Sequence, residues 1–131
     1  MPTVEEGLVA QMLATGALTT LVATRIYWGL AAQDAPRPYL TFAQIAGVRQ
    51  PAMGVDTGIV QARYQITAWA DTADSAKDTI AAVRGALERY RGTVDTIEVI
   101  DTFVENELGP LWDDVALAQS YVMDFLVWHR E

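Results

Sequence analysis

The chain has 131 residues, of which 51% are hydrophobic, and its net charge is −8. This length fits one domain, residues 1–131, with enough apolar side chains for a core. The absence of cysteine excludes disulfides, thiolate nucleophiles and cysteine-ligated zinc, and a reducing cytosol is therefore the expected compartment. No segment approaches the ~18 apolar residues of a membrane span. Glu5 and Glu6 stand where a signal peptide would carry basic residues, which argues against secretion.

The negative charge is concentrated in the last third of the chain. Residues 1–91 hold eight basic and eight acidic residues, whereas residues 92–129 hold eight acidic residues and neither lysine nor arginine. This distribution disfavours phosphate binding through that part, because nucleic-acid affinity depends on cationic side chains. The acids predict either a solvated surface that keeps the protein soluble, or a surface that meets a basic partner or repels passing DNA.

The first third predicts a helix from Thr3, with Thr3 and Glu6 forming a capping box and Val4, Leu8 and Met12 on its buried side. Residues 17–22 could add a short helical turn, residues 25–28 are briefly extended, and residues 29–37 read as a loop.

The middle of the chain predicts two strands and a second helix. Pro36 and Pro38 favour extended structure, and Tyr39 to Ile45 follows as a strand with bulk on both faces. Residues 46–58 are rich in glycine and proline and indicate a long loop. From Ile59 to Ala68 the apolar residues alternate, which is the period of a half-buried strand. Three- and four-residue spacing then predicts a helix from an Asp71-Thr72 cap to Tyr90, ended by Gly92.

The last part predicts a second pair of strands. Residues 93–104 are rich in β-branched residues, Gly109-Pro110 indicates a turn in a loop over 106–114, and residues 115–128 form a long last strand. The expected fold is an α+β domain: a mostly antiparallel sheet of about four strands with two helices packed on it.

Catalytic patterns are lacking in the sequence, and we expect no enzyme, no cofactor and no metal. The only lysine, Lys77, precedes Asp78, so no phosphate-binding loop is present. The only histidine, His129, is expected at a surface or interface rather than in a triad. Asp71, Asp74 and Asp78 suit helix capping better than catalysis. Asp113 and Asp114 could bind a cation but are interpreted as turn residues.

Several segments resemble a known family. Arg25-Ile26-Tyr27 followed by Pro36-x-Pro38-Tyr39 resembles the start of the tail-completion or tail-terminator (head–tail joining) proteins of long-tailed phages and gene-transfer particles. The strand 62–69 with its following helix, and the ending Phe125 to Glu131, are similar to the central and closing elements of that family. The resemblance covers nearly the whole chain in the same order.

The resemblance implies a structural protein that works in a virion or phage-like particle assembled in the bacterial cytoplasm. Such proteins form a ring, usually a hexamer, on the end of the tail tube, stop tail polymerisation and join the tail to a head connector or stopper. DNA passes through without specific binding, and no membrane is involved. The alternatives are another neck component, such as a connector or stopper, or, from a different class, a small cytosolic α+β ligand-binding domain or enzyme.

Two sets of residues are expected to serve assembly. Loops and loop tryptophans are good anchors for interfaces. The interface set is Arg49, Gln50, Met53, Trp28 and Trp112. Acidic side chains on a channel wall would let DNA slide without sticking, and an axial face meeting a basic neighbour is the other placement. The acidic set is Glu98, Asp101, Glu105, Asp113 and Asp114.

Overall fold

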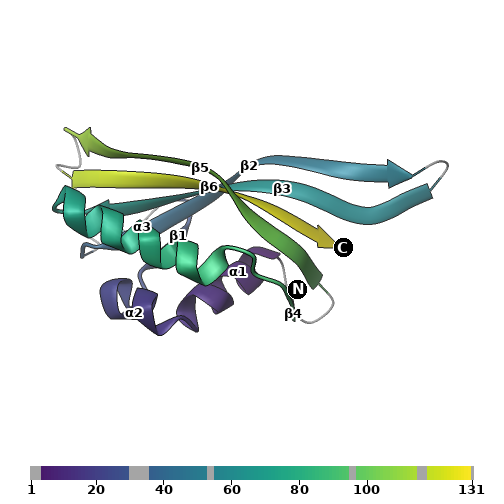
Figure 1. Cartoon of the computed structure of the whole chain (residues 1–131), viewed down its shortest axis with the longest axis horizontal. Helices are drawn as coiled ribbons and strands as arrows, with labels where there is room; N and C mark the ends of the chain where they lie inside the picture. Colours follow the sequence, from purple (N-terminus) through teal and green to yellow (C-terminus); the bar gives the residue numbers. More distant parts are fainter. Residues whose placement is uncertain (1–3, 30–35, 53–54, 95–96, 115–117, 131) are drawn as a thin grey trace.

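The described residues form one six-stranded sheet with three helices on one of its faces (Figure 1). The computed structural model describes residues 4–29, 36–52, 55–94, 97–114 and 118–130, without the side chains of 48–52, 55–58, 94, 97 and 113. The helices are α1 (Val4–Leu13), α2 (Gly16–Val22) and α3 (Ala73–Leu87). The strands are β1 (Ile26–Trp28), β2 (Tyr39–Ala52), β3 (Val55–Ala70), β4 (Gly92–Val94), β5 (Ile97–Asp113) and β6 (Ala118–Arg130).

The strands lie in the order β1-β2-β3-β6-β5-β4. Only β1 and β2 run parallel, and every other neighbouring pair is antiparallel. The mixed α and β architecture and the mostly antiparallel sheet are as predicted. The prediction of about four strands and two helices was wrong in number, because the short pieces were undercounted. Residues 26–28 pair with β2, the stretch after α3 divides into β4 and β5, and residues 16–22 form a helix of their own.

The long loop predicted over 46–58 is a continuation of two strands. β2 pairs with β3 as far as Ala52 and Val55, and residues 53–54 between them lie outside the description. Register shifts after Gln44 and after Gln50 mark β-bulges, which accommodate extra residues without ending a ladder. Pro51 is tolerated because β2 has no neighbour on its other side there among the described residues.

The loop predicted over 106–114 is also strand. β5 continues through Gly109-Pro110, and the register shift between Leu108 and Leu111 places these residues in a bulge opposite β6. Gly109 has φ +150°, and a Cβ there would stand 2.9 Å from ring atoms of Tyr121. Glycine therefore lets β5 pass close to that ring, and what looked like a turn signal in the sequence marks a local bend in a strand.

The core lies between the sheet and the helices. The alternation predicted for β3 is confirmed, since Val60, Ala62, Tyr64, Ile66 and Ala68 are all buried. α3 covers β3, β6 and β5 and contributes the predicted apolar stripe. The stripe consists of Ala76, Ile80, Val83 and Leu87. The buried side of α1, with Val4, Leu8 and Met12, is confirmed as well; Thr3 of the expected capping box lies outside the described residues.

The predicted start of α3 is confirmed, although the helix ends at Leu87 rather than Tyr90. Thr72 is the N-cap, and its Oγ1 accepts a hydrogen bond from the Ser75 amide at 3.1 Å. No helix among the described residues is long and apolar enough to cross a membrane.

Replacing Thr72 by alanine leaves the Ser75 amide without its cap and is expected to lower the free energy of unfolding by about 1 kcal/mol. Thr72→Ser keeps a hydroxyl acceptor, so its free energy of unfolding should stay within a few tenths of a kcal/mol of the wild-type value. Urea denaturation followed by circular dichroism measures both. An equal loss in the two variants would show that the hydroxyl has no capping role.

Candidate assembly surfaces

An apolar groove runs between α1 and the β1–β2 edge of the sheet. Its volume is about 610 Å³, and Trp28 forms part of its wall. The Trp28 ring lies edge-on against Phe42 at a centroid distance of 4.8 Å, yet 53% of the residue is exposed. The lining residues are Glu5, Glu6, Val9, Ala10, Leu13, Trp28 and Phe42.

The chemistry of this groove suits a protein surface better than a metabolite. The charged residues that line it, Glu5 and Glu6, are both acidic, and the Tyr64 hydroxyl donates to Glu5 Oε1 at 2.9 Å. A small-molecule site usually adds several convergent polar groups that fix the ligand's orientation. The rest of this wall is aliphatic or aromatic, which favours packing by apolar side chains.

A second set of exposed apolar side chains lies on β5, at the other end of the strand order, with Trp112 on the strand face opposite to Leu108 and Leu111. Leu108, Leu111 and Trp112 are 54%, 41% and 53% exposed, which is unusual for three large apolar side chains within five residues. The indole Nε1 of Trp112 donates to Asp114 Oδ1. β4 pairs with β5 only over Ile97 to Val99 of β5. Beyond Thr102, this edge of β5 therefore has no strand beside it among the described residues. Both tryptophans of the predicted interface set therefore lie on exposed surfaces, on different sides of the molecule.

The acidic side chains predicted for a channel or axial face share one strand. Glu98, Asp101 and Glu105 belong to β5, and each is paired with an arginine. Arg130 stands 3.7 Å from Glu98, and Arg63 reaches Glu105 from β3. Counting charge along the sequence missed this neutralisation, because most of the arginines come from the first two thirds of the chain. The side chain of Asp113 lies outside the described residues, and Asp114 is exposed.

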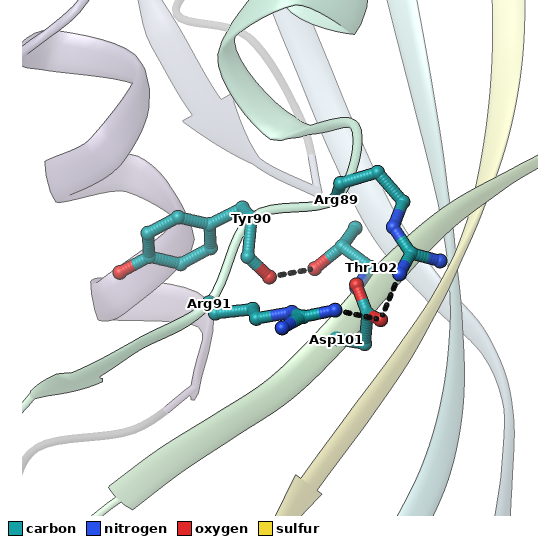
Figure 2. Close-up of polar contacts among 5 residues, drawn as sticks. All are labelled: Arg89, Tyr90, Arg91, Asp101 and Thr102. Carbon is teal, nitrogen blue, oxygen red and sulfur yellow. Dashed lines mark hydrogen bonds and ion pairs between the residues drawn. The ribbon is translucent and has the colours of Figure 1, made fainter.

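Asp101 is the centre of a polar clasp that fixes the end of α3 to β5 (Figure 2). Its Oδ2 lies 2.9 Å from Arg89 and 3.2 Å from Arg91, and its Oδ1 accepts from the Thr102 amide at 2.9 Å. The Arg89 amide donates to the Thr102 carbonyl at 2.7 Å, while the Thr102 hydroxyl donates to the Tyr90 carbonyl. Two arginines share one carboxylate, so the clasp carries a net positive charge at this edge.

The outer part of the β2–β3 hairpin projects beyond the rest of the sheet (Figure 1). β6 pairs with β3 only as far as Ile59, so the hairpin beyond that residue has two strands and no third partner among the described residues. Arg49 and Gln50 of the predicted interface set lie in the β2 strand of this projection; their side chains, and all of Met53, lie outside the description. An isolated two-stranded ribbon is marginally stable in water, which makes this projection a natural contact element.

The described part of the chain holds no group of three or more histidine, aspartate and glutamate side chains that could bind a metal ion. Asp71, Asp74 and Asp78 are exposed around the start of α3, and Asp71 is ion-paired with Arg37 at 3.0 Å. The expectation of a surface or interface His129 was wrong. This residue is 5% exposed and is paired with Val60 of β3 and Val99 of β5. It is buried because the alternation of buried and partly buried side chains along β6 continues almost to the end of the strand.

Comparison with known proteins adds independent information. The model of the family described as "Tail completion protein gp17" matches residues 6–108. The fold is similar to a chain in the solved structure "Virion of native gene transfer agent (GTA) particle", with a TM-score of 0.70 and 18% identity, over 95% of this chain and 92% of that one. No curated protein matches the sequence significantly. The family match spans most of the chain and places it among the structural tail proteins of virions and phage-like particles: the chain belongs to the tail completion protein gp17 family.

Proposed function

We propose that the protein forms a ring, most simply a hexamer, that caps the tail tube. The ring ends tail polymerisation, joins the tail to a head connector or stopper, and lets DNA pass through. The observation that carries this proposal is the family match over residues 6–108. Two different sets of exposed apolar side chains, at the two ends of the strand order, support it, since a head-to-tail ring uses two unlike patches on every subunit.

The projecting β2–β3 hairpin is proposed to contact the tail tube or a neighbouring subunit through its outer part, including Arg49, Gln50 and Met53. The lack of a covering layer there supports this role, because partner contacts would supply what the ribbon lacks. β5, with Glu98, Asp101, Glu105, Asp113 and Asp114, is proposed to face the channel or an axial neighbour. The arginine partners of Glu98, Asp101 and Glu105 make this surface mildly rather than strongly repulsive to DNA.

The decisive experiment removes the gene for this protein and examines the particles by electron microscopy. A tail cap that is missing should give overlong tails that are not joined to heads, and supplying the wild-type chain should restore tails of uniform length. A connector or stopper that is missing should instead give tails of normal length beside heads that have lost their DNA. Normal, joined tails in the absence of the protein would contradict the proposal.

A further inference from the structure

The sheet face opposite the helices, called here the helix-free face, carries an unpaired carboxylate on one of its two central strands (Figure 1). Asp124 lies on β6 between Met123 and Phe125, which are both fully buried in the core, so its side chain points to the helix-free face. Oδ1 of Asp124 is nevertheless buried, and it accepts no hydrogen bond from any described residue. Buried polar atoms nearly always have a hydrogen-bond partner, so this oxygen requires an explanation.

The neighbours of Asp124 across the sheet leave its charge unbalanced. It is paired in register with Gln65 of β3 and Asn106 of β5, whose side chains are neutral amides. Arg63 lies diagonally from it on β3 but is ion-paired with Glu105. None of the ion pairs between described residues involves Asp124. Its carboxylate is therefore available to a basic group from another molecule.

Exposed apolar side chains lie beside this carboxylate on the same face. Leu108 of β5 is paired with Val122, two residues along β6 from Asp124, and Leu111 is paired with Ser120, two residues further. Leu108 and Leu111 are 54% and 41% exposed, so a molecule that covers them removes a substantial apolar area from water.

Aromatic rings extend this surface toward β2. Trp69 of β3 is paired with Ser120, in the same row as Leu111, and its ring stacks on Tyr39 at a centroid distance of 6.4 Å. Its indole Nε1 donates to Thr41 Oγ1 at 3.1 Å, which fixes the ring. The helix-free face therefore presents a preformed apolar and aromatic surface around one carboxylate, a composition that suits a protein partner.

The partner has to supply a cation, and this chain has few to offer. Arg25 donates to two backbone carbonyls, and Lys77 lies next to Asp78 and three residues from Asp74, so its surroundings are acidic. The other arginines with described side chains already form ion pairs with carboxylates of their own chain: Arg37, Arg63, Arg84, Arg89, Arg91 and Arg130. With the net charge of −8, this favours a different, basic protein over a second copy.

We propose that the helix-free face docks a basic partner protein. A lysine or arginine of the partner pairs with Asp124, while apolar side chains of the partner pack on Leu108 and Leu111. The inference rests on the proposed tail-capping function, and it adds the surface and the chemistry through which the protein contacts a neighbour in the particle. The free subunit holds an acceptor that is matched only on assembly, so Asp124 lowers the stability of the free subunit and strengthens the complex.

Substitutions at Asp124 separate stability from assembly. In the purified chain, Asp124→Leu removes the unmatched acceptor and should raise the melting temperature by roughly 3–6 °C. In cells that lack the native gene, Asp124→Leu and Asp124→Arg should both lower the yield of joined tails by about tenfold or more. Asp78→Arg makes the same charge change as Asp124→Arg on the exposed surface of α3, and its yield should equal wild type. Calorimetry measures the melting, and electron microscopy counts the joined tails.

Photo-cross-linking in the particle identifies the occupant of the face. A photoreactive amino acid is placed at position 108 in place of the exposed leucine, and purified particles are illuminated. The expected product joins this chain to a different particle protein, through a segment of that protein that carries lysine or arginine. The same amino acid at position 81, in place of the exposed Ala81 of α3, is the control and should not give this product. Peptide mass spectrometry identifies the joined segments.

A second copy at this face would give a different result. Arg49, whose side chain lies outside the description, is the remaining basic residue of the chain. A product from position 108 that is a dimer of this chain would overturn the proposed partner. Recovery of joined tails when Arg49→Asp is added to Asp124→Arg would overturn it as well.

The remaining outcomes separate this inference from the proposed function. Wild-type yields of joined tails with Asp124→Arg would overturn the docking and leave tail capping in place. An Asp124→Leu chain that melts below wild type would show that the carboxylate serves the fold, which would also overturn the inference. Normal, joined tails in the absence of the protein would instead remove the proposed function.

Discussion

Replacing Phe125 by alanine is expected to lower the free energy of unfolding by about 3–5 kcal/mol, the usual cost of removing a large buried aromatic side chain. Phe125 is fully buried in β6, between Tyr64 of β3 and Val104 of β5. Domains of this kind have total stabilities of roughly 5–15 kcal/mol, so the loss is a large part of the whole. The melting temperature should fall by roughly 10–20 °C.

The neighbouring residue provides a matched control for this prediction. Leu126 follows Phe125 on the same strand, so it points to the opposite face of the sheet, where it is only partly buried. Leu126→Ala should therefore cost less than about 1.5 kcal/mol. Thermal and urea denaturation of both variants measure the difference. Equal losses at the two positions would mean that the core is not confined to the helix side of the sheet.

The second large effect is expected at Asp101. Its side chain is only 14% exposed, and its replacement by alanine removes the partner of Arg89 and Arg91 together with the acceptor of the Thr102 amide. A hydrogen bond to a charged group contributes about 1.5–3 kcal/mol, and exposed ion pairs contribute less than about 1 kcal/mol, so most of the loss should come from the shielded carboxylate and its bond to the Thr102 amide. We expect Asp101→Ala to lower the free energy of unfolding by about 2–3 kcal/mol.

Glu98→Ala is the control for the clasp, because its ion pair with Arg130 is long and exposed and should contribute less than about 0.5 kcal/mol. Asp101→Asn keeps a carbonyl acceptor for Thr102 but not the charge, and its loss should be intermediate. Urea denaturation ranks the three variants. If Glu98→Ala and Asp101→Ala were equally destabilising, the ion pairs on β5 would act as a general charge balance rather than as a specific clasp.

The sequence predicts this fold well where one pattern dominates. The alternation of β3 and the helical spacing of α3 predicted the covered strand, its covering helix and the Thr72 cap, because these features depend on neighbours in sequence. Glycine and proline misled the prediction at Pro51 and Gly109, since ladders with β3 and β6 override local turn preference. Whether a glycine or proline ends a strand or lies in a bulge depends on which strands pair with that segment. A single sequence does not show this pairing.

The candidate surfaces were predictable only in part. Trp28 and Trp112 were expected to serve interfaces, and both are exposed. The concentration of acidic residues in β5 was visible in the sequence. The ion pairs that Glu105 and Asp101 form with Arg63 and Arg89 were not, because they depend on a fold that brings distant segments together. The α1 groove depends on packing between α1 and β2, which no periodicity in either segment predicts.

The order of the strands also bears on how the protein folds. β2–β3 with α3, and β5–β6, are units made of segments close in sequence, which form quickly. The sheet becomes continuous only when β3 meets β6, where Ile59 pairs with Arg130 and Ala70 with Gln119. Loop-closure entropy is largest for this step, so we expect it to come late. Until the two halves join, Tyr64 and Phe125 remain uncovered on one side. Before β3 pairs with β6, the partly folded chain exposes apolar core residues and is prone to aggregate. After this pairing, the core is covered and the subunit is ready to assemble.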